Sequence, residues 1–167
     1  MGVIPTDIYI QVENRLKGRW KAIEQAEKAL EKAKAKATAG RSMQTPSGGS
    51  KTRSTRSRVE RAAILIVTAE KALDTAWKWE EVFRRLDDIF PPDKTNEGFV
   101  ASLLYGNGMS QEDVCRFTHC ARQTVRRRRD RYIGYAALLA ADKGLIDMKG
   151  MVDDGDADPE IGSAEKN

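Results

Sequence analysis

The sequence predicts an all-α protein in which a long antiparallel helical hairpin precedes a C-terminal helix-turn-helix unit. Two long segments repeat apolar residues at three- and four-residue steps, which is the spacing of one helical face. A third segment joins a short serine-capped helix to an arginine-rich helix. These observations divide the 167-residue chain into an N-terminal long helix (1–40), a flexible basic linker (41–57), a second long helix (58–92), a helix-turn-helix domain (93–146) and a disordered acidic tail (147–167).

The first long helix is expected from about Thr6 to Ala37. Thr6 or Asp7 can cap its start, because a short side-chain oxygen accepts a backbone N–H that has no partner in the first turn. Gly40 is a stop signal after the last turn. The apolar face of this helix comprises Ile8, Val12, Leu16, Trp20, Ile23, Ala26 and Leu30.

The second long helix is expected from about Val59 to Phe90. Pro91 and Pro92 end it, because proline lacks the backbone donor and clashes with the preceding turn. Its apolar face comprises Val59, Ala62, Ile66, Ala69, Leu73, Trp77, Val82, Leu86 and Ile89. A helix cannot bury a narrow stripe alone, so the two helices should pack as a hairpin or share their stripes between subunits. The tryptophans expected in this packing are Trp20, Trp77 and Trp79.

The segment between the two helices, GRSMQTPSGGSKTRSTRSR, is rich in glycine, serine, threonine and basic residues, which is typical of a flexible linker. Its GGSKT is similar to a phosphate-binding loop. That motif needs glycine directly before the lysine and an apolar strand leading into it. Here Ser50 precedes Lys51 and no such strand is present in the sequence, so we expect no nucleotide site.

Charge is distributed unevenly along the chain. The last 17 residues, from Met151, hold six acids and one base, a net −5; because the whole chain carries +4, the first 150 residues carry +9. A basic body with an acidic tail favours a polyanionic partner, most often nucleic acid. Two cysteines, no apolar run near the ~18 residues of a membrane span and no secretion signal together predict a cytoplasmic protein without a membrane partner.

The spacing between Ser110 and Val125 fits a helix-turn-helix that begins at Gln111. The motif needs apolar residues where its two helices cross, a small residue at the fifth position and a left-handed turn at the ninth, which usually holds glycine. The residues that fit are Val114 (fourth), Cys115 (fifth), Cys120 (tenth) and Val125 (fifteenth). Thr118 (eighth) is weakly apolar and His119 (ninth) replaces glycine, although histidine is tolerated in left-handed turns.

Seven arginines lie between Arg116 and Arg131, mostly on the second helix of this motif. When Val125 is buried, the outward positions of that helix are Gln123, Arg126, Arg127 and Asp130. Arginine can bind guanine with two hydrogen bonds and glutamine can bind adenine, while other bases can neutralise phosphates. The predicted DNA-binding residues are Arg116, Arg122, Gln123, Thr124, Arg126, Arg127, Arg129 and Arg131. Arg128 occupies a usually apolar position, and its head should reach water or an acid such as Asp113.

The segment YGNGMSQEDVCRFTHCARQTVRRRRDRYIGYAALL resembles region four of bacterial sigma factors. It is more similar to small phage-encoded transcription regulators that contain this region, including late-gene activators of the RinA and ArpU type. Their plan of charged helix, Gly/Ser linker, second long helix and sigma-like motif covers residues 1–145 here. The resemblance implies a phage or prophage regulator that binds promoter DNA in the host bacterial cytoplasm, contacts host RNA polymerase and forms a homodimer through the long helices.

Two alternatives to a regulator remain open. A phage small terminase subunit also joins a helix-turn-helix to long oligomerising helices and recognises packaging-site DNA; a closed ring would favour the terminase, whereas a monomer or dimer would favour the regulator. A helical adaptor could instead use the arginines to bind RNA or an acidic protein.

No enzyme, cofactor or metal site is expected. Cys115, His119 and Cys120 are soft ligands close together, but structural zinc needs four ligands and the chain holds no further Cys or His. The tail sequence DGDADPEIGSAE resembles a calcium loop in the placement of its acids. Its sixth position is Pro159, where that loop needs glycine for a sharp turn.

Overall fold

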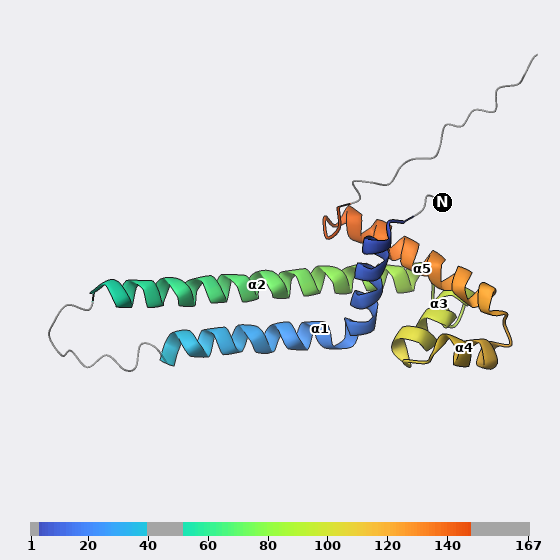
Figure 1. Ribbon diagram of the computed structural model, residues 1–167, viewed down its shortest axis with the longest axis horizontal. Helices are drawn as coiled ribbons and strands as arrows, with labels where there is room; N and C mark the ends of the chain where they lie inside the picture. Colours follow the sequence, from blue (N-terminus) through green and yellow to red (C-terminus); the bar gives the residue numbers. More distant parts are fainter. Residues whose placement is uncertain (1–3, 40–51, 148–167) are drawn as a thin grey trace, which may run out of the picture.

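Five α-helices and one π-helical turn form the computed structural model, which describes residues 4–39 and 52–147 (Figure 1). The helices are α1 (Thr6–Ala39), α2 (Thr52–Ile89), α3 (Asn96–Ala101), α4 (Gln111–Thr118) and α5 (Arg122–Asp142), and the π-helical turn η1 (Ser102–Gly106) continues α3. No strand occurs in the two described ranges, which confirms the all-helical prediction. None of the helices described there is long and apolar enough to cross a membrane.

The start of α2 differs from the expected one. α2 begins at Thr52, so residues 52–57, expected in the linker, are helical. At the start of the expected helix-turn-helix domain, α3 passes into η1 at Ser102. The remainder of the predicted linker and nearly all of the acidic tail, including its calcium-like sequence, lie outside the described residues.

α1 and α2 lie side by side, and the chain returns along α2 after it has passed along α1 (Figure 1). We call residues 20–39 and 59–78, which extend away from the other helices, the arm. Its inner side is lined mainly by small residues, because Ala33 and Ala76 are buried there and Ala62 and Ala69 are half-buried. Small side chains allow a close approach of the two helices but bury little apolar surface.

The main core lies where the first turns of α1, the last turns of α2 and the second half of α5 meet. Its largest fully buried side chains are Phe83, Leu86 and Ile133. On the α5 side, Ala136, Ala137 and Ala140 lie beside Tyr132 and Ile133, and these alanines let the three helices pack closely. The whole cluster comprises Ile8, Val12, Leu16, Trp79, Val82, Phe83, Leu86, Phe90, Ala101, Tyr132, Ile133, Ala136, Ala137 and Ala140.

Two of the three tryptophans expected in the packing are exposed. Trp79 is buried, but Trp20 is 69% exposed and Trp77 is 53% exposed, so neither is buried within the hairpin. α1 bends within its first half (Figure 1), and the helix holds a glycine there, Gly18, which weakens it. Because of the bend, the apolar stripe of α1 no longer points inward at Trp20. On α2 the buried position of this turn is Ala76, so the neighbouring Trp77 projects outward, whereas Trp79 and Phe83 are buried farther along the helix.

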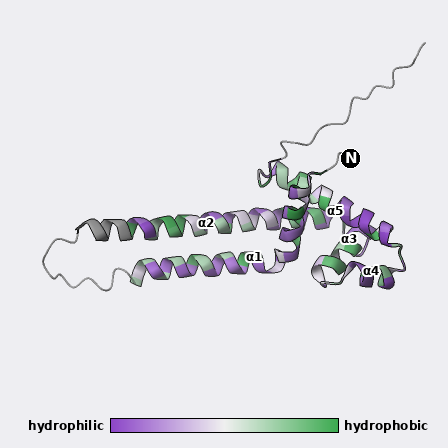
Figure 2. Cartoon of the chain, in the orientation of Figure 1, coloured by the Kyte–Doolittle hydropathy of each residue, from purple (hydrophilic) through white to green (hydrophobic). Residues whose placement is uncertain are grey.

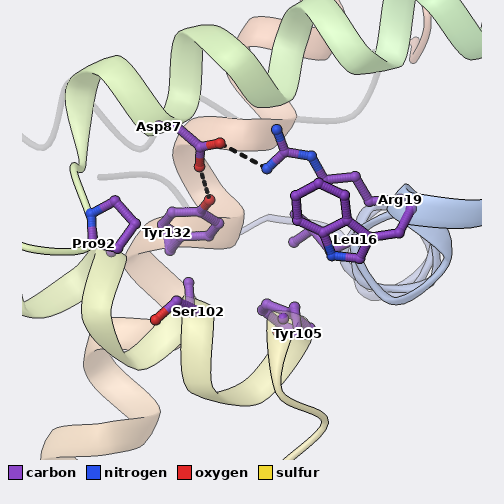
Figure 3. A pocket seen from close by; sticks show the side chains of 11 residues that line it. Leu16, Arg19, Asp87, Pro92, Ser102, Tyr105 and Tyr132 are labelled. Atoms are coloured by element: carbon purple, nitrogen blue, oxygen red, sulfur yellow. Dashed lines mark hydrogen bonds and ion pairs between the residues drawn. The ribbon is translucent and has the colours of Figure 1, made fainter.

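A polar network joins α1, α2 and α5 beside this core. Arg19 donates to Asp87 Oδ2 at 2.7 Å and to Glu80 Oε1 at 3.2 Å, and the Tyr132 hydroxyl donates to Asp87 Oδ1 at 3.2 Å. Burial and the nearby Asp87 charge raise the pKa of Tyr132, so its hydroxyl remains a donor. Figure 3 shows Asp87 between its two partners, at the edge of a small pocket whose other lining residues include Leu16, Pro92, Ser102 and Tyr105.

The end of α2 and the start of α3 are in close contact. A Cβ atom at Gly98 would overlap the Phe90 carbonyl oxygen, so only glycine fits this position. The Thr95 hydroxyl oxygen caps α3 by accepting a hydrogen bond from the Gly98 N–H at 3.1 Å. This contact sets the direction in which α3 leaves the end of α2.

Candidate nucleic-acid interface

α4 is a short helix whose start is fixed by Ser110. The Ser110 hydroxyl oxygen accepts a hydrogen bond from the Asp113 N–H at 3.2 Å, and the hydroxyl donates to the Asp113 carboxylate at 2.6 Å. Glu112 and Asp113 lie in the first turn, where the helix dipole favours negative charge. The predicted serine cap is therefore confirmed.

The turn after α4 is left-handed, as the sequence predicts for its ninth position. His119 has φ 51° and ψ 29°. It is the one non-glycine residue with positive φ in the part of the chain that the structure describes. The Thr118 hydroxyl donates to the Val114 carbonyl oxygen at 2.7 Å, so the polar group at the weakly apolar eighth position is satisfied within its own helix.

α4 and α5 meet at Val114 and Val125, which are both fully buried. These two side chains pack with Val100 of α3 and Leu103 of η1 in a second cluster, separate from the main core. The Gln111 side-chain amide also donates to the Arg122 carbonyl oxygen at 3.4 Å. The contacts fix the direction of the first turns of α5 relative to α4.

The first two turns of α5 present polar and basic side chains to solvent. Figure 2 shows this part of the helix as hydrophilic, at the end of the molecule opposite the far end of the arm. Neither Arg122 nor Arg127 forms an ion pair with any residue of the described ranges. The exposed residues here are Arg122, Gln123, Thr124, Arg126 and Arg127.

Three of the predicted arginines are exposed but lie near a carboxylate. Arg116 is 3.6 Å from Asp113, Arg126 is 3.6 Å from Asp130, and Arg131 is 3.3 Å from Glu97. The pairs of Arg116 and Arg126 join side chains that are exposed on both sides, and such pairs contribute little to stability, because water screens them and they restrict long side chains. The partner of Arg131, Glu97, is less exposed, but the arginine itself extends into solvent. Each of these arginines can therefore exchange its carboxylate for another anion.

Arg129 is the predicted interface residue that the structure places differently. Its guanidinium lies 5.6 Å from the centroid of the Tyr9 ring of α1 and 3.2 Å from Asp130, and its side chain is 22% exposed. Arg129 thus lies between α5 and α1 and does not join the exposed basic side chains of the first turns. Its position is that of a brace between the two helices.

Tyr9 also contacts this part of α5, and the sequence pattern does not predict this contact. Its hydroxyl donates to Asp130 Oδ1 at 2.7 Å, across 121 positions of sequence. Burial and this hydrogen bond raise the pKa of Tyr9, so the hydroxyl remains a donor. The sequence predicts Asp130 on the outward side of α5, whereas α1 holds it here. In the sequence, the sign of a separate role for Asp130 is that it is the single acid among the arginines.

Arg128 is half-buried and has a different partner from the one expected. Its guanidinium donates to Cys120 Sγ at 3.5 Å, and no contact to Asp113 is found. Cys115 and Cys120 are free thiols that pack against the second cluster. Within residues 4–39 and 52–147, no group of three or more His, Cys, Asp or Glu side chains is arranged to hold a metal ion.

Comparisons of the chain with protein-family models, with curated proteins and with solved structures find no match.

Proposed function

We propose that this chain is a sequence-specific transcription regulator that binds double-stranded DNA through a helix-turn-helix formed by α4, the turn at His119 and α5. The observation that carries the proposal is the asymmetry of the first half of α5. Val125 is buried against Val114, whereas Arg122, Arg126 and Arg127 on other sides of the helix are exposed. The major groove of B-DNA admits one α-helix whose first turns can contact base edges.

The outward side chains of α5 have the chemistry needed to distinguish bases. Arg126 and Arg127 can each donate two hydrogen bonds to guanine, and Gln123 can exchange two with adenine. Arg122 lies on the first turn beside them. These four residues are the base-reading group in this proposal.

Other predicted residues surround the base-reading group and suit phosphate contacts. Arg116 projects from α4 with 78% of its side chain exposed, and Arg131 is 56% exposed farther along α5. Thr124 is exposed on the first turns and offers a hydroxyl donor. Phosphate contacts set the register of the protein on the duplex without reading sequence. Arg129 is a positioning residue here, because it holds α5 against Tyr9.

The antiparallel hairpin of the arm and the sigma-like motif also support a proposal about where the protein acts. The resemblance to phage late-gene activators favours a phage or prophage regulator that binds promoter DNA in the bacterial cytoplasm, with host RNA polymerase as a second partner. A small terminase subunit would use the same helices on packaging-site DNA.

One binding assay separates the classes of ligand. We expect the full chain to bind duplex DNA more tightly than single-stranded RNA or polyglutamate at equal ionic strength, because most arginines of the candidate interface lie on one rigid helix, α5. Preference for RNA or for polyglutamate would reject the proposal in favour of an adaptor. A genome-wide pull-down of bound DNA then separates the two DNA-binding functions: a promoter-proximal peak supports the regulator, and a peak at the packaging site supports the terminase.

A further inference from the structure

α2 carries two stripes at alternating four- and three-residue steps on different sides. The inner stripe packs against α1 and comprises Ala62, Ile66, Ala69, Leu73 and Ala76, all buried or half-buried. The outer stripe comprises Glu60, Ile64, Val67 and Lys71, all exposed. Ile64 is 64% exposed and Val67 is 49% exposed, and both project from the arm.

The outer stripe is complementary to itself in the antiparallel direction. It has the order acid, apolar, apolar, base along the chain, so the reversed order places a base opposite each acid. With a two-fold axis between Leu65 and Ile66, Glu60 of one copy lies opposite Lys71 of the other, and Ile64 lies opposite Val67. A parallel pair in register would place Glu60 against Glu60, and like charges at such positions repel.

We propose that the outer stripe of α2 binds the same stripe of a second copy of this chain in antiparallel orientation, forming a two-fold homodimer. Four- and three-residue steps are the spacing at which two helices pack side by side along a continuous seam. A two-fold interface uses one surface twice, and this stripe meets that requirement in both shape and charge. The two arms would together form a four-helix layer that removes Ile64 and Val67 from water.

The dimer also fixes the positions of the two candidate DNA-binding units. At a helical rise of 1.5 Å per residue, the end of α2 lies about 35 Å from the two-fold axis. The two ends of α2 are then about 70 Å apart, on opposite sides of the axis. The first turns of α5 lie beyond those ends (Figure 1), so the half-sites should be separated by more than about two turns of B-DNA. This spacing rests on the proposed function, whereas the dimer itself does not.

Exchanging the charges at positions 60 and 71 tests both whether the dimer forms and whether its two α2 helices run antiparallel. Sedimentation equilibrium of the full chain should show a monomer–dimer equilibrium. Glu60→Lys or Lys71→Glu alone should raise the dissociation constant of the dimer roughly five- to thirtyfold, because each change creates two like-charge pairs between the copies. The double variant Glu60→Lys/Lys71→Glu should return the constant to near its original value. The two positions lie three turns apart on one helix and cannot touch within a chain, so such rescue arises only between copies.

Matched variants complete the test. Ile64→Lys should leave only monomer, and Arg84→Glu, an exposed change on α2 outside the outer stripe, should leave the equilibrium unchanged. Unaltered thermal melting of the helical signal at 222 nm establishes that each variant is folded. A chain that stays monomeric, a closed ring, or a double variant that stays as weak as the single ones would each overturn the inference. A dimer without affinity for DNA contradicts the proposed function alone, and a monomer that binds DNA contradicts this inference alone.

Discussion

The two halves of α5 have opposite surroundings within one 21-residue helix. In the first half, Val125 is the buried side chain, and Arg122, Arg126 and Arg127 are exposed. In the second half, Tyr132, Ile133, Ala136, Ala137 and Ala140 are each 4% exposed or less and belong to the main core. The difference shows how one helix can separate anchoring from surface chemistry, since the exposed residues of its first two turns can change without disturbing the main core.

The two halves also depend on each other. Neighbouring positive charges destabilise a helix, so the arginine-rich half would be a poor helix by itself. Its helical form is maintained by the buried second half at one end and by Val125 at the other. Asp130, held by Tyr9, adds one negative charge among the arginines. Four changes test this division of roles, beginning with the largest expected effect.

Val125→Asp should unfold the unit formed by α4 and the first half of α5. The change buries an unpaired carboxylate in the second cluster, which should cost more than about 4 kcal/mol. Chemical denaturation followed by circular dichroism measures this loss. Thr124→Asp, one position earlier but exposed, is the matched control and should leave the protein folded. A normal denaturation curve for Val125→Asp would show that the assumed crossing of the two helices is wrong.

Ile133→Ala should destabilise the whole protein while leaving the exposed surface intact. The side chain is fully buried, and removing a buried isoleucine to alanine costs about 2–5 kcal/mol. Leu138→Ala on the same helix, 45% exposed, should cost much less. DNA affinity of the folded fraction should not change. Equal losses of stability for the two variants would mean that the second half of α5 is not the anchor.

Arg126→Ala and Arg127→Ala should weaken DNA binding without destabilising the protein, which is the converse of the effect of Ile133→Ala. Each should weaken binding to the preferred duplex by about 1–3 kcal/mol and relax the choice of base at one position, with no change in melting temperature. Fluorescence anisotropy with the preferred duplex and its single-base variants measures both effects, and Arg84→Ala is the exposed control. Unchanged affinity for the preferred duplex would remove these residues from the base-reading group.

Tyr9→Phe should have the smallest effect, about 0.5–1.5 kcal/mol of stability, because Asp130 loses one hydrogen bond but keeps Arg129. The raised pKa of Tyr9 gives this effect a pH dependence. The unfolded tyrosine ionises near pH 10 while the folded one does not, so the stabilisation is present below about pH 10 and declines above it. A stability difference between the two proteins that stays constant through alkaline pH would contradict the buried hydroxyl contact.

The sequence predicts local features well and contacts between distant segments poorly. The cap at Ser110, the left-handed His119 and the meeting of Val114 with Val125 follow from spacing within a few turns, because helix geometry determines which side chains face each other. The contact between Tyr9 and Asp130 does not follow from spacing, since it depends on how α1 crosses α5.

The tryptophans illustrate the same limit. The stripe that includes Trp20 has regular helical spacing, but the bend of α1 turns that position outward, and no single-helix pattern records the bend. The inward position of Arg129 likewise requires the ring of a residue from another helix. Helix content and the exposed arginines of the first turns of α5 were therefore predictable, while the brace behind them was not.

The most direct test of the central claim is an amide chemical-shift map of the protein, recorded by NMR as its preferred duplex is added. If the first turns of α5 contact DNA, the largest changes should occur at residues 122–127, with little change at residues 138–142 of the same helix. Large shifts confined to the arm or to the second half of α5, with the first turns unaffected, would contradict this contact.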